Sequence, residues 1–187
     1  MAATVVGISA CKDTTAPSLD YIRADITGAV EDTFRSGIQV TSWFHIRRGF
    51  DMYKISGFDT RTRYYSVGGT QVESRRGIFL MGLDRNAFPQ GEVPLQLLDP
   101  EDSTSSGWVA IYTQDSLRFV SQRGFIRPTE VTAEAVMGTF EFDAFRYCVD
   151  EGTVRCTVPD QPPADAVWIE VVGRFRGEPP EADSTGS

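Results

Sequence analysis

The feature that most constrains the fold is a regular alternation of apolar and polar residues in two segments. In GTFEFDAF, residues 138–145, one side of an extended chain is apolar and the other polar, namely Phe140, Phe142 and Ala144 against Thr139, Glu141 and Asp143. In AVWIEVVGRF, residues 166–175, the corresponding sets are Val167, Ile169, Val171 and Phe175 against Trp168, Glu170 and Arg174. A strand with one buried and one wet face is typical of an antiparallel sheet.

Glycine and proline separate further short segments that favour β-branched and aromatic residues, which indicates many strands joined by turns. The expected strands are Tyr21–Thr27, Val40–Ile46, Met52–Phe58, Arg63–Val67, Gly77–Leu83, Val93–Leu98, Trp108–Thr113, Leu117–Ser121, Glu134–Cys148, Thr153–Val158 and Ala166–Phe175. Only Ala29–Ser36 and Glu130–Val136 carry a weak helical signal. We predict an all-β, antiparallel β-sandwich over residues 20–177, with a small closed or partly open β-barrel as the alternative.

Charge and hydropathy exclude two classes of protein. The 187 residues carry a net charge of −8, and nucleic-acid binding requires clustered Lys and Arg instead. No segment approaches the roughly 18 apolar residues of a membrane-spanning helix. Any attachment to a membrane must therefore come from something other than a membrane-spanning helix.

The first cysteine is a candidate site for a lipid anchor. Ile8-Ser9-Ala10-Cys11 resembles the bacterial lipobox, which implies cleavage before Cys11 and lipidation of that residue. We expect residues 1–10 to be a truncated signal peptide, because they lack a basic n-region and a full apolar core. Residues 11–19 are polar and proline-containing and are predicted to tether the domain, while residues 178–187 are predicted to be a disordered tail.

The other two cysteines flank a hairpin-like sequence. Cys148 and Cys156 stand on either side of VDEGTVR, and a turn centred on Gly152 would place them opposite each other within reach of a disulfide. Such a bond requires an oxidising compartment; two buried free thiols in a cytosolic protein are the alternative. With one histidine in the chain and no second cysteine pair, we expect no metal site and no cofactor.

The order of motifs resembles the DUF6252-like family of small lipoproteins from Bacteroidota and neighbouring phyla. The motifs are GIFLMGLD at 77–84, WVAIYT at 108–113, SQRGFIRPTEV at 121–131, MGTFEFDAF at 137–145 and WIEVVGRF at 168–175. The resemblance implies a β fold and attachment to the bacterial envelope, with the outer membrane as the expected location. The family is uncharacterised, so the resemblance implies no activity.

Catalytic signals are weak. His45 has no nucleophile-elbow motif to accompany it and is interpreted as a structural or surface residue. Glu141, Asp143 and Glu170 lie on predicted wet faces and suggest a glycosidase-like carboxylate pair. The acidic loop Asp99–Asp102 offers oxygen ligands but lacks the spacing of a calcium loop.

Aromatic residues suggest a binding platform instead. Trp43, Tyr64, Trp108 and Trp168 are the candidates for a surface that contacts a carbohydrate or protein ligand. We therefore predict a lipid-anchored envelope protein with a non-enzymatic binding or structural role and no assigned catalytic residue. A carbohydrate-active or metal-dependent hydrolase that uses surface carboxylates is the alternative, and association through an exposed sheet edge is a third possibility.

Overall fold

The computed structural model describes residues 21–36, 38–45, 50–67, 70–83, 91–99, 107–132, 134–149 and 157–178. These segments form ten strands, and no helix occurs among them. The strands are β1 (Tyr21–Gly28), β2 (Asp32–Ser36), β3 (Ile38–His45), β4 (Phe50–Val67), β5 (Thr70–Gly82), β6 (Val93–Gln96), β7 (Trp108–Gln114), β8 (Leu117–Val131), β9 (Val136–Val149) and β10 (Trp168–Gly177). The all-β prediction is confirmed.

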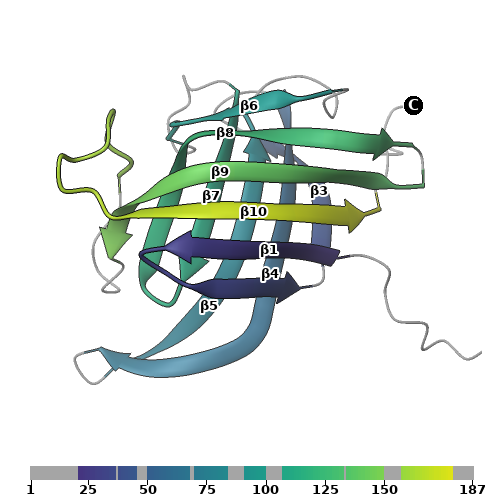
Figure 1. The fold of residues 1–187 in the computed structure, drawn as a ribbon. Coiled ribbons are helices and arrows are strands. Elements are labelled where there is room, and N and C mark those ends of the chain that lie inside the picture. The colour runs from purple at the N-terminus through teal and green to yellow at the C-terminus, as the bar shows by residue number, and fades with distance from the viewer. Residues whose placement is uncertain are drawn as a thin grey trace, which may run out of the picture.

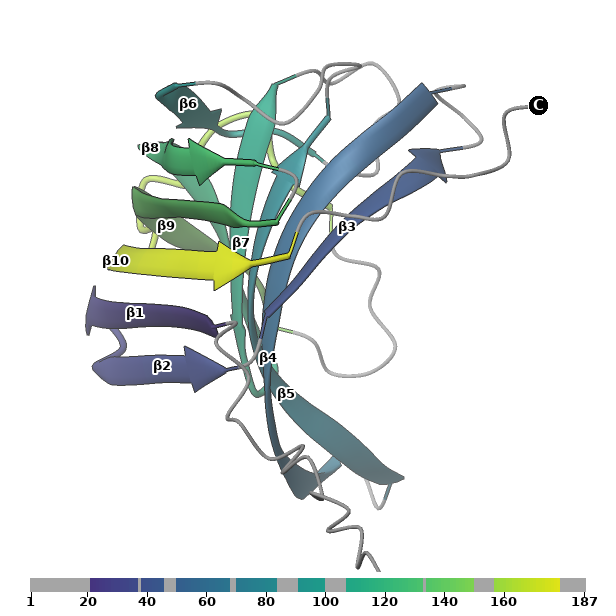
Figure 2. The same ribbon diagram turned by 90° about the vertical axis from the view of Figure 1, so that its right-hand side faces the viewer.

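One continuous sheet forms the whole fold. Its strand order is β2-β1-β10-β9-β8-β6-β7-β5-β4-β3, with an additional pairing of β8 with β7, and only the β6–β7 pair is parallel. The sheet folds over on itself, so that a front layer of β6, β8, β9, β10, β1 and β2 faces a back layer of β7, β5, β4 and β3 (Figures 1 and 2). Strands of the two layers run crosswise, and β2 approaches β4. This nearly closed shape is consistent with both the sandwich and the barrel prediction.

Strand β8 bends from the back layer into the front layer. Its first residues pair with β7 up to Val120, and from Arg123 onward it pairs with β6. The register against β9 shifts between Ser121 and Arg123. Gly124 follows with φ at +148°, and a β-carbon there would stand 2.6 Å from Phe142 Cα, so the bend requires glycine.

The main core lies between the two layers. It includes the apolar residues of the alternating segments, and Phe140, Phe142, Ala144, Ile169, Val171 and Phe175 are all buried. Their polar neighbours face outward, as expected: Thr139, Glu141, Glu170 and Arg174 are exposed and Asp143 is half-buried. The alternation therefore predicts correctly which face of β9 and β10 meets solvent.

A second, smaller core covers the outer side of the back layer. Leu83, Val109, Ile111, Val120, Phe145 and Val158 form it. Val158 belongs to the segment 157–167, whose chain is fixed by a hydrogen bond from Arg146 N to Val167 O of 2.8 Å. This packing positions the start of β10, where Trp168 stands.

Two predicted local structures are wrong. The segment Ala29–Ser36 contains strand β2 rather than a helical turn, because pairing with β1 and burial of Phe34 outweigh its weak helical propensity. The segment Glu130–Val136 contributes to β8, β9 and the turn between them, in which Thr132 Oγ1 accepts hydrogen bonds from Glu134 N and Ala135 N.

The other differences concern strand limits. Met52–Phe58 and Arg63–Val67 are parts of one strand, β4, with a register shift between Asp59 and Arg63. Of the predicted strand Thr153–Val158, residues 153–156 lie outside the described residues, and residues 157 and 158 are not in a strand. None of the described residues forms a helix that could span a membrane.

Candidate functional site

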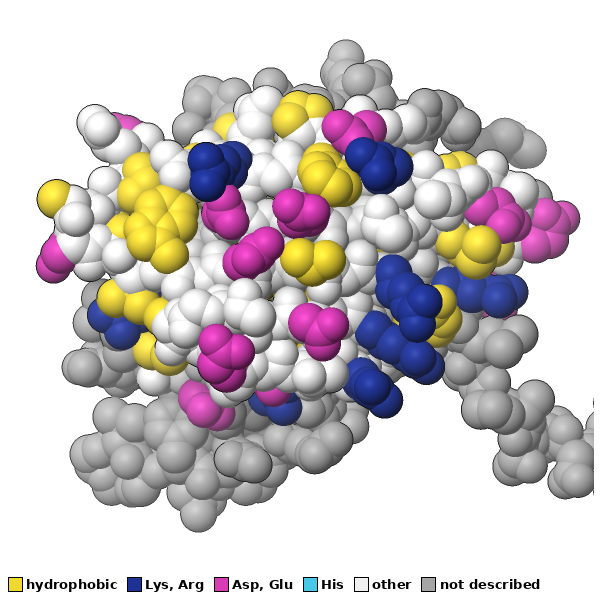
Figure 3. Space-filling view, in the orientation of Figure 1, with side chains coloured by type: hydrophobic (Ala, Val, Ile, Leu, Met, Phe, Trp, Pro, Cys, Tyr) yellow, Lys and Arg dark blue, Asp and Glu magenta, His cyan; other side chains and the backbone are white. Residues whose placement is uncertain are grey.

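A pocket opens on the outer face of the front layer, at the end where β10 begins. Its volume is about 430 Å³, and it is lined by Thr27, Gly28, Gln122, Arg123, Asp143, Trp168, Ile169 and Glu170. These residues come from the end of β1, the bend of β8, the middle of β9 and the start of β10. At that end of the face, on the left in Figure 3, hydrophobic side chains lie beside basic and acidic ones.

Trp168 is the aromatic residue of this pocket. Its side chain is supported by Phe145, with ring centroids 5.6 Å apart and the rings tilted by 57°. It nevertheless remains 38% exposed, whereas most large hydrophobic residues described are buried. A supported but exposed indole offers a rigid apolar surface to a ligand.

Two carboxylates meet beside it. Asp143 on β9 and Glu170 on β10 are direct cross-strand partners, a relationship in which β-carbons lie about 4.5 to 5.5 Å apart. Arg123 Nε donates to Asp143 Oδ2 at 2.5 Å. Of the three carboxylates predicted from sequence, the structure therefore brings two into the pocket.

The third predicted carboxylate lies next to the pocket rather than in it. Glu141 stands opposite Val172 on β10 and Phe125 on β8. Val172 is 45% exposed, and it lies between Glu170 and Arg174 on the outward side of β10.

The predicted aromatic platform is not assembled as a whole. Trp108 is only 7% exposed and belongs to the core, where it lies over Gly82. Trp43 is paired with Met52 in the back layer, and Tyr64 is paired with Glu73 in the outer part of the β4–β5 hairpin. The side chains of Trp43 and Tyr64 lie outside the described residues, so Trp168 alone is placed at the surface.

The remaining predicted residues are dispersed. His45 is the last residue of β3 and pairs with Phe50. Asp99 follows β6, while the rest of its acidic loop, residues 100–106, lies outside the described residues. Within the described residues, no three acidic, histidine or cysteine side chains are grouped so as to hold a metal ion.

The cysteines are placed only in part. Cys148 is buried near the end of β9, whereas Cys11 and Cys156 lie outside the described residues. Both the lipidation and the disulfide consequently remain predictions.

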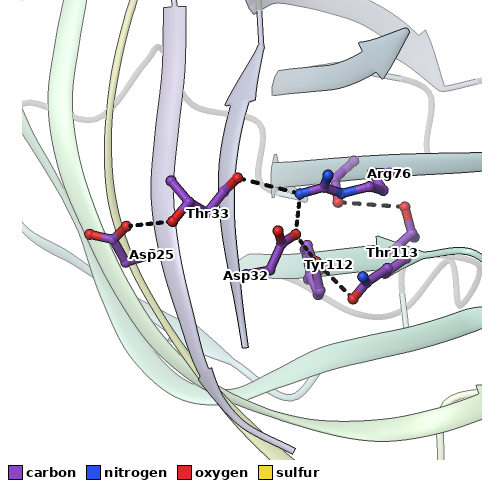
Figure 4. Close-up of polar contacts among 8 residues, drawn as sticks. Asp25, Asp32, Thr33, Arg76, Tyr112 and Thr113 are labelled. Atoms are coloured by element: carbon purple, nitrogen blue, oxygen red, sulfur yellow. Dashed lines mark hydrogen bonds and ion pairs between the residues drawn. The ribbon is translucent and has the colours of Figure 1, made fainter. Parts of the chain in front are cut away.

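A second polar cluster is partly buried and joins the two layers (Figure 4). Asp32, at the start of β2, forms an ion pair with Arg76 of β5 and accepts a hydrogen bond of 3.0 Å from the Tyr112 hydroxyl of β7. Burial, followed by the charge and hydrogen bond of Asp32, raises the pKa of Tyr112 above its ordinary value, although Arg76 opposes the effect. Because both contacts of Asp32 link β2 of the front layer to a strand of the back layer, the cluster stabilises the closure of the sheet.

Sequence reasoning missed the contribution of β8 to the pocket. Gln122 and Arg123 lie beyond the predicted end of that strand at Ser121. The available signal was the sequence Ser121-Gln122-Arg123-Gly124, because polar residues followed by glycine inside an apolar strand pattern indicate a bulge.

Comparison of the chain with family models, curated proteins and solved structures finds no match. The geometry of the site must therefore carry the functional argument.

Proposed function

We propose that the chain is a lipid-anchored, non-enzymatic carbohydrate-binding domain of the bacterial envelope. The observation that carries this proposal is the exposed Trp168 at a pocket of about 430 Å³ that also holds Asp143, Glu170 and Arg123. A ligand site of this kind combines an apolar surface with a few convergent polar groups.

The chemistry of the pocket matches a sugar ring. The ring presents C–H groups on its faces, which pack on an indole, and hydroxyl groups at its edge. The carboxylates of Asp143 and Glu170 accept hydrogen bonds from hydroxyls, and Arg123 and Gln122 donate them. Thr27 of β1 is the cross-strand partner of Glu170, and its hydroxyl can both donate and accept hydrogen bonds.

Glycoside hydrolysis is the second candidate, because Asp143 and Glu170 face each other as a carboxylate pair. Glycosidases require one carboxyl group to donate a proton and the other to act as nucleophile or base. Arg123 engages Asp143 in an ion pair, and an ion-paired carboxylate accepts hydrogen bonds rather than donating a proton. The ion pair leaves Asp143 the role of nucleophile or base, so hydrolysis stays the second candidate, and binding on the exposed Trp168 is the preferred function.

The envelope location rests on the sequence. The lipobox-like residues end at Cys11, and the polar stretch that follows reaches the first strand at Tyr21. Acyl chains on that cysteine would hold the domain at a membrane surface, because each buried CH₂ contributes about 0.8 kcal/mol.

The test is a titration calorimetry series with neutral oligosaccharides of two to six units. We expect binding by the unaltered chain and a loss of about tenfold or more in Trp168→Ala, equivalent to about 1.4 kcal/mol. Trp168→Phe should retain most of the affinity, and Val172→Ala is the matched control on the same strand and face. Thermal unfolding of each variant separates loss of binding from loss of fold, because Trp168 also packs on Phe145.

Three results would decide against the proposal. If no oligosaccharide binds, or if Trp168→Ala binds as well as Val172→Ala, the pocket is not a carbohydrate site. If incubation releases shorter sugars and Glu170→Gln abolishes that release, the protein is a hydrolase.

A further inference from the structure

Three arginines face one another on adjacent strands of the front layer. Arg35 of β2 pairs with Arg23 of β1, and Arg23 pairs in turn with Arg174 of β10. All three side chains are exposed on the outer face. Like charges placed directly opposite each other across strands destabilise a sheet, so this arrangement does not serve folding.

In the part of the chain that the structure describes, no carboxylate is paired with any of the three charges. Among the described residues, neither these arginines nor Arg176 forms a salt bridge. By contrast, two other arginines of the same face are paired: Arg123 with Asp143, and Arg127 with Glu92.

An aromatic ring holds the cluster together instead. The guanidinium of Arg23 lies 4.7 Å from the centroid of the Tyr21 ring, and that of Arg174 lies 5.8 Å from it. Arg176 is the direct cross-strand partner of Tyr21. We call Arg23, Arg35, Arg174 and Arg176 the arginine patch.

The patch occupies one end of the front layer, where β1 begins and β10 ends. Figure 3 shows basic side chains gathered on the right of the face, with acidic ones in its middle and at its right-hand edge. The pocket around Trp168 lies at the opposite end of β10. The two features are thus separate sites on one face.

The position along the chain indicates what the patch meets. Tyr21 follows Cys11 by ten residues, which span at most about 35 Å when extended. A lipid on Cys11 would therefore hold the patch close to the membrane surface. Because charges further away than about 8 Å are screened at physiological salt, the patch rather than the net charge of −8 governs a contact at this end.

We propose that the arginine patch docks the domain on the phosphodiester headgroups of anionic lipids. Guanidinium groups bind phosphate oxygens through paired hydrogen bonds, and arginine is suited to this geometry. The orientation relative to the membrane rests on the proposed lipid anchor, but the affinity for headgroups does not require the acyl chains.

The experiment uses the full chain in its unlipidated form and measures cosedimentation with vesicles. Vesicles of phosphatidylcholine with 30% phosphatidylglycerol are compared with vesicles of pure phosphatidylcholine at 0.1 M salt. We expect binding only to the anionic vesicles and weakening by added salt. The double variant R23Q/R174Q should bind about 25-fold more weakly, because each basic residue near an anionic membrane contributes about fivefold.

A matched double variant removes the same charge elsewhere. R118Q/R146Q changes the start of β8 and the second half of β9, outside both the patch and the pocket, and should bind the anionic vesicles as the unaltered chain does. Thermal unfolding of R23Q/R174Q should be unchanged or higher, since repulsion between facing arginines is removed.

Three outcomes would overturn the proposal: equal binding to both kinds of vesicle, equal loss in the two double variants, and displacement by millimolar inorganic phosphate, which would indicate a site for a soluble anion. Failure here is distinguishable from failure of the proposed function. Oligosaccharide affinity is measured on R23Q/R174Q without membranes, and lipidation is measured by the mass of the native protein.

Discussion

Phe140 on β9 and Gly173 on β10 are direct cross-strand partners, and the phenyl ring occupies the space that a side chain at position 173 would fill. A β-carbon on residue 173 would also stand 2.5 Å from the carbonyl oxygen of Arg23 on β1. The glycine therefore allows three strands of the front layer to pack around one buried ring.

Replacement of this glycine should weaken the fold. We expect Gly173→Ala to lower the free energy of unfolding by about 1 to 3 kcal/mol, because the new methyl group overpacks the core. Urea denaturation followed by tryptophan fluorescence measures the change. Phe140→Leu provides the partner for a double-mutant cycle, in which the smaller side chain should relieve part of the penalty. Strict additivity of the two substitutions would contradict the proposed contact.

Alkaline pH should reveal the buried tyrosine. In the unfolded chain a tyrosine releases its proton near pH 10, whereas the pKa of Tyr112 in the folded chain is raised by burial and by Asp32. Above pH 10 the folded state thus binds the proton more tightly than the unfolded state, so stability falls as pH rises. Below pH 10 this contribution is fully present.

Tyr112→Phe isolates that contribution. At pH 8 the variant should be less stable by about 1 to 2 kcal/mol, because the hydrogen bond to Asp32 is lost. Between pH 10 and 11 the difference from the unaltered chain should shrink, because phenylalanine does not titrate. Urea denaturation at each pH measures it, and a constant difference from pH 8 to 11 would show that Tyr112 does not control the alkaline loss.

Lipidation makes a prediction about mass. Protein extracted from membranes of its native host should begin at Cys11 and carry diacylglycerol, and Cys11→Ser should abolish both changes. Intact-mass spectrometry measures them. A native chain that retains Met1 without added mass would rule out the anchor.

The disulfide makes a separate prediction. Non-reducing peptide mapping of the exported protein should recover one peptide pair that joins Cys148 to Cys156. The buried position of Cys148 near the end of β9 allows little contact with solvent reagents. If both thiols are alkylated without reduction, the bond is absent, and with it the argument for an oxidising compartment.

The alternation of apolar and polar residues was enough to predict which face of β9 and β10 is buried. Phe142 and Ile169 are buried while Glu141 and Glu170 are exposed. Successive side chains of a strand point to opposite faces, so once one face packs on a core, the apolar residues must occupy that face. The same reasoning failed for β2, whose five residues are held in place by β1 on one side. In a strand of five residues, the alternation of apolar and polar side chains is too short to outweigh the helical propensity of the segment.

The two proposed sites depend on register, which local pattern does not encode. Asp143 and Glu170 become neighbours only through the pairing of β9 with β10, and Arg23 meets Arg174 only through the pairing of β1 with β10. Each arginine alone is an ordinary exposed residue. The cluster is a property of three paired strands rather than of any one segment.

The bend in β8 has a consequence for how the molecule comes apart. Strand β8 contributes to both layers: Val120 pairs with β7 in the back layer, and Ile126 pairs with β6 in the front layer. Unfolding of either layer would therefore break hydrogen bonds of the strand that the other layer also needs. The two cores therefore share a single cooperative unit, and calorimetry should record one transition whose van't Hoff and calorimetric enthalpies agree.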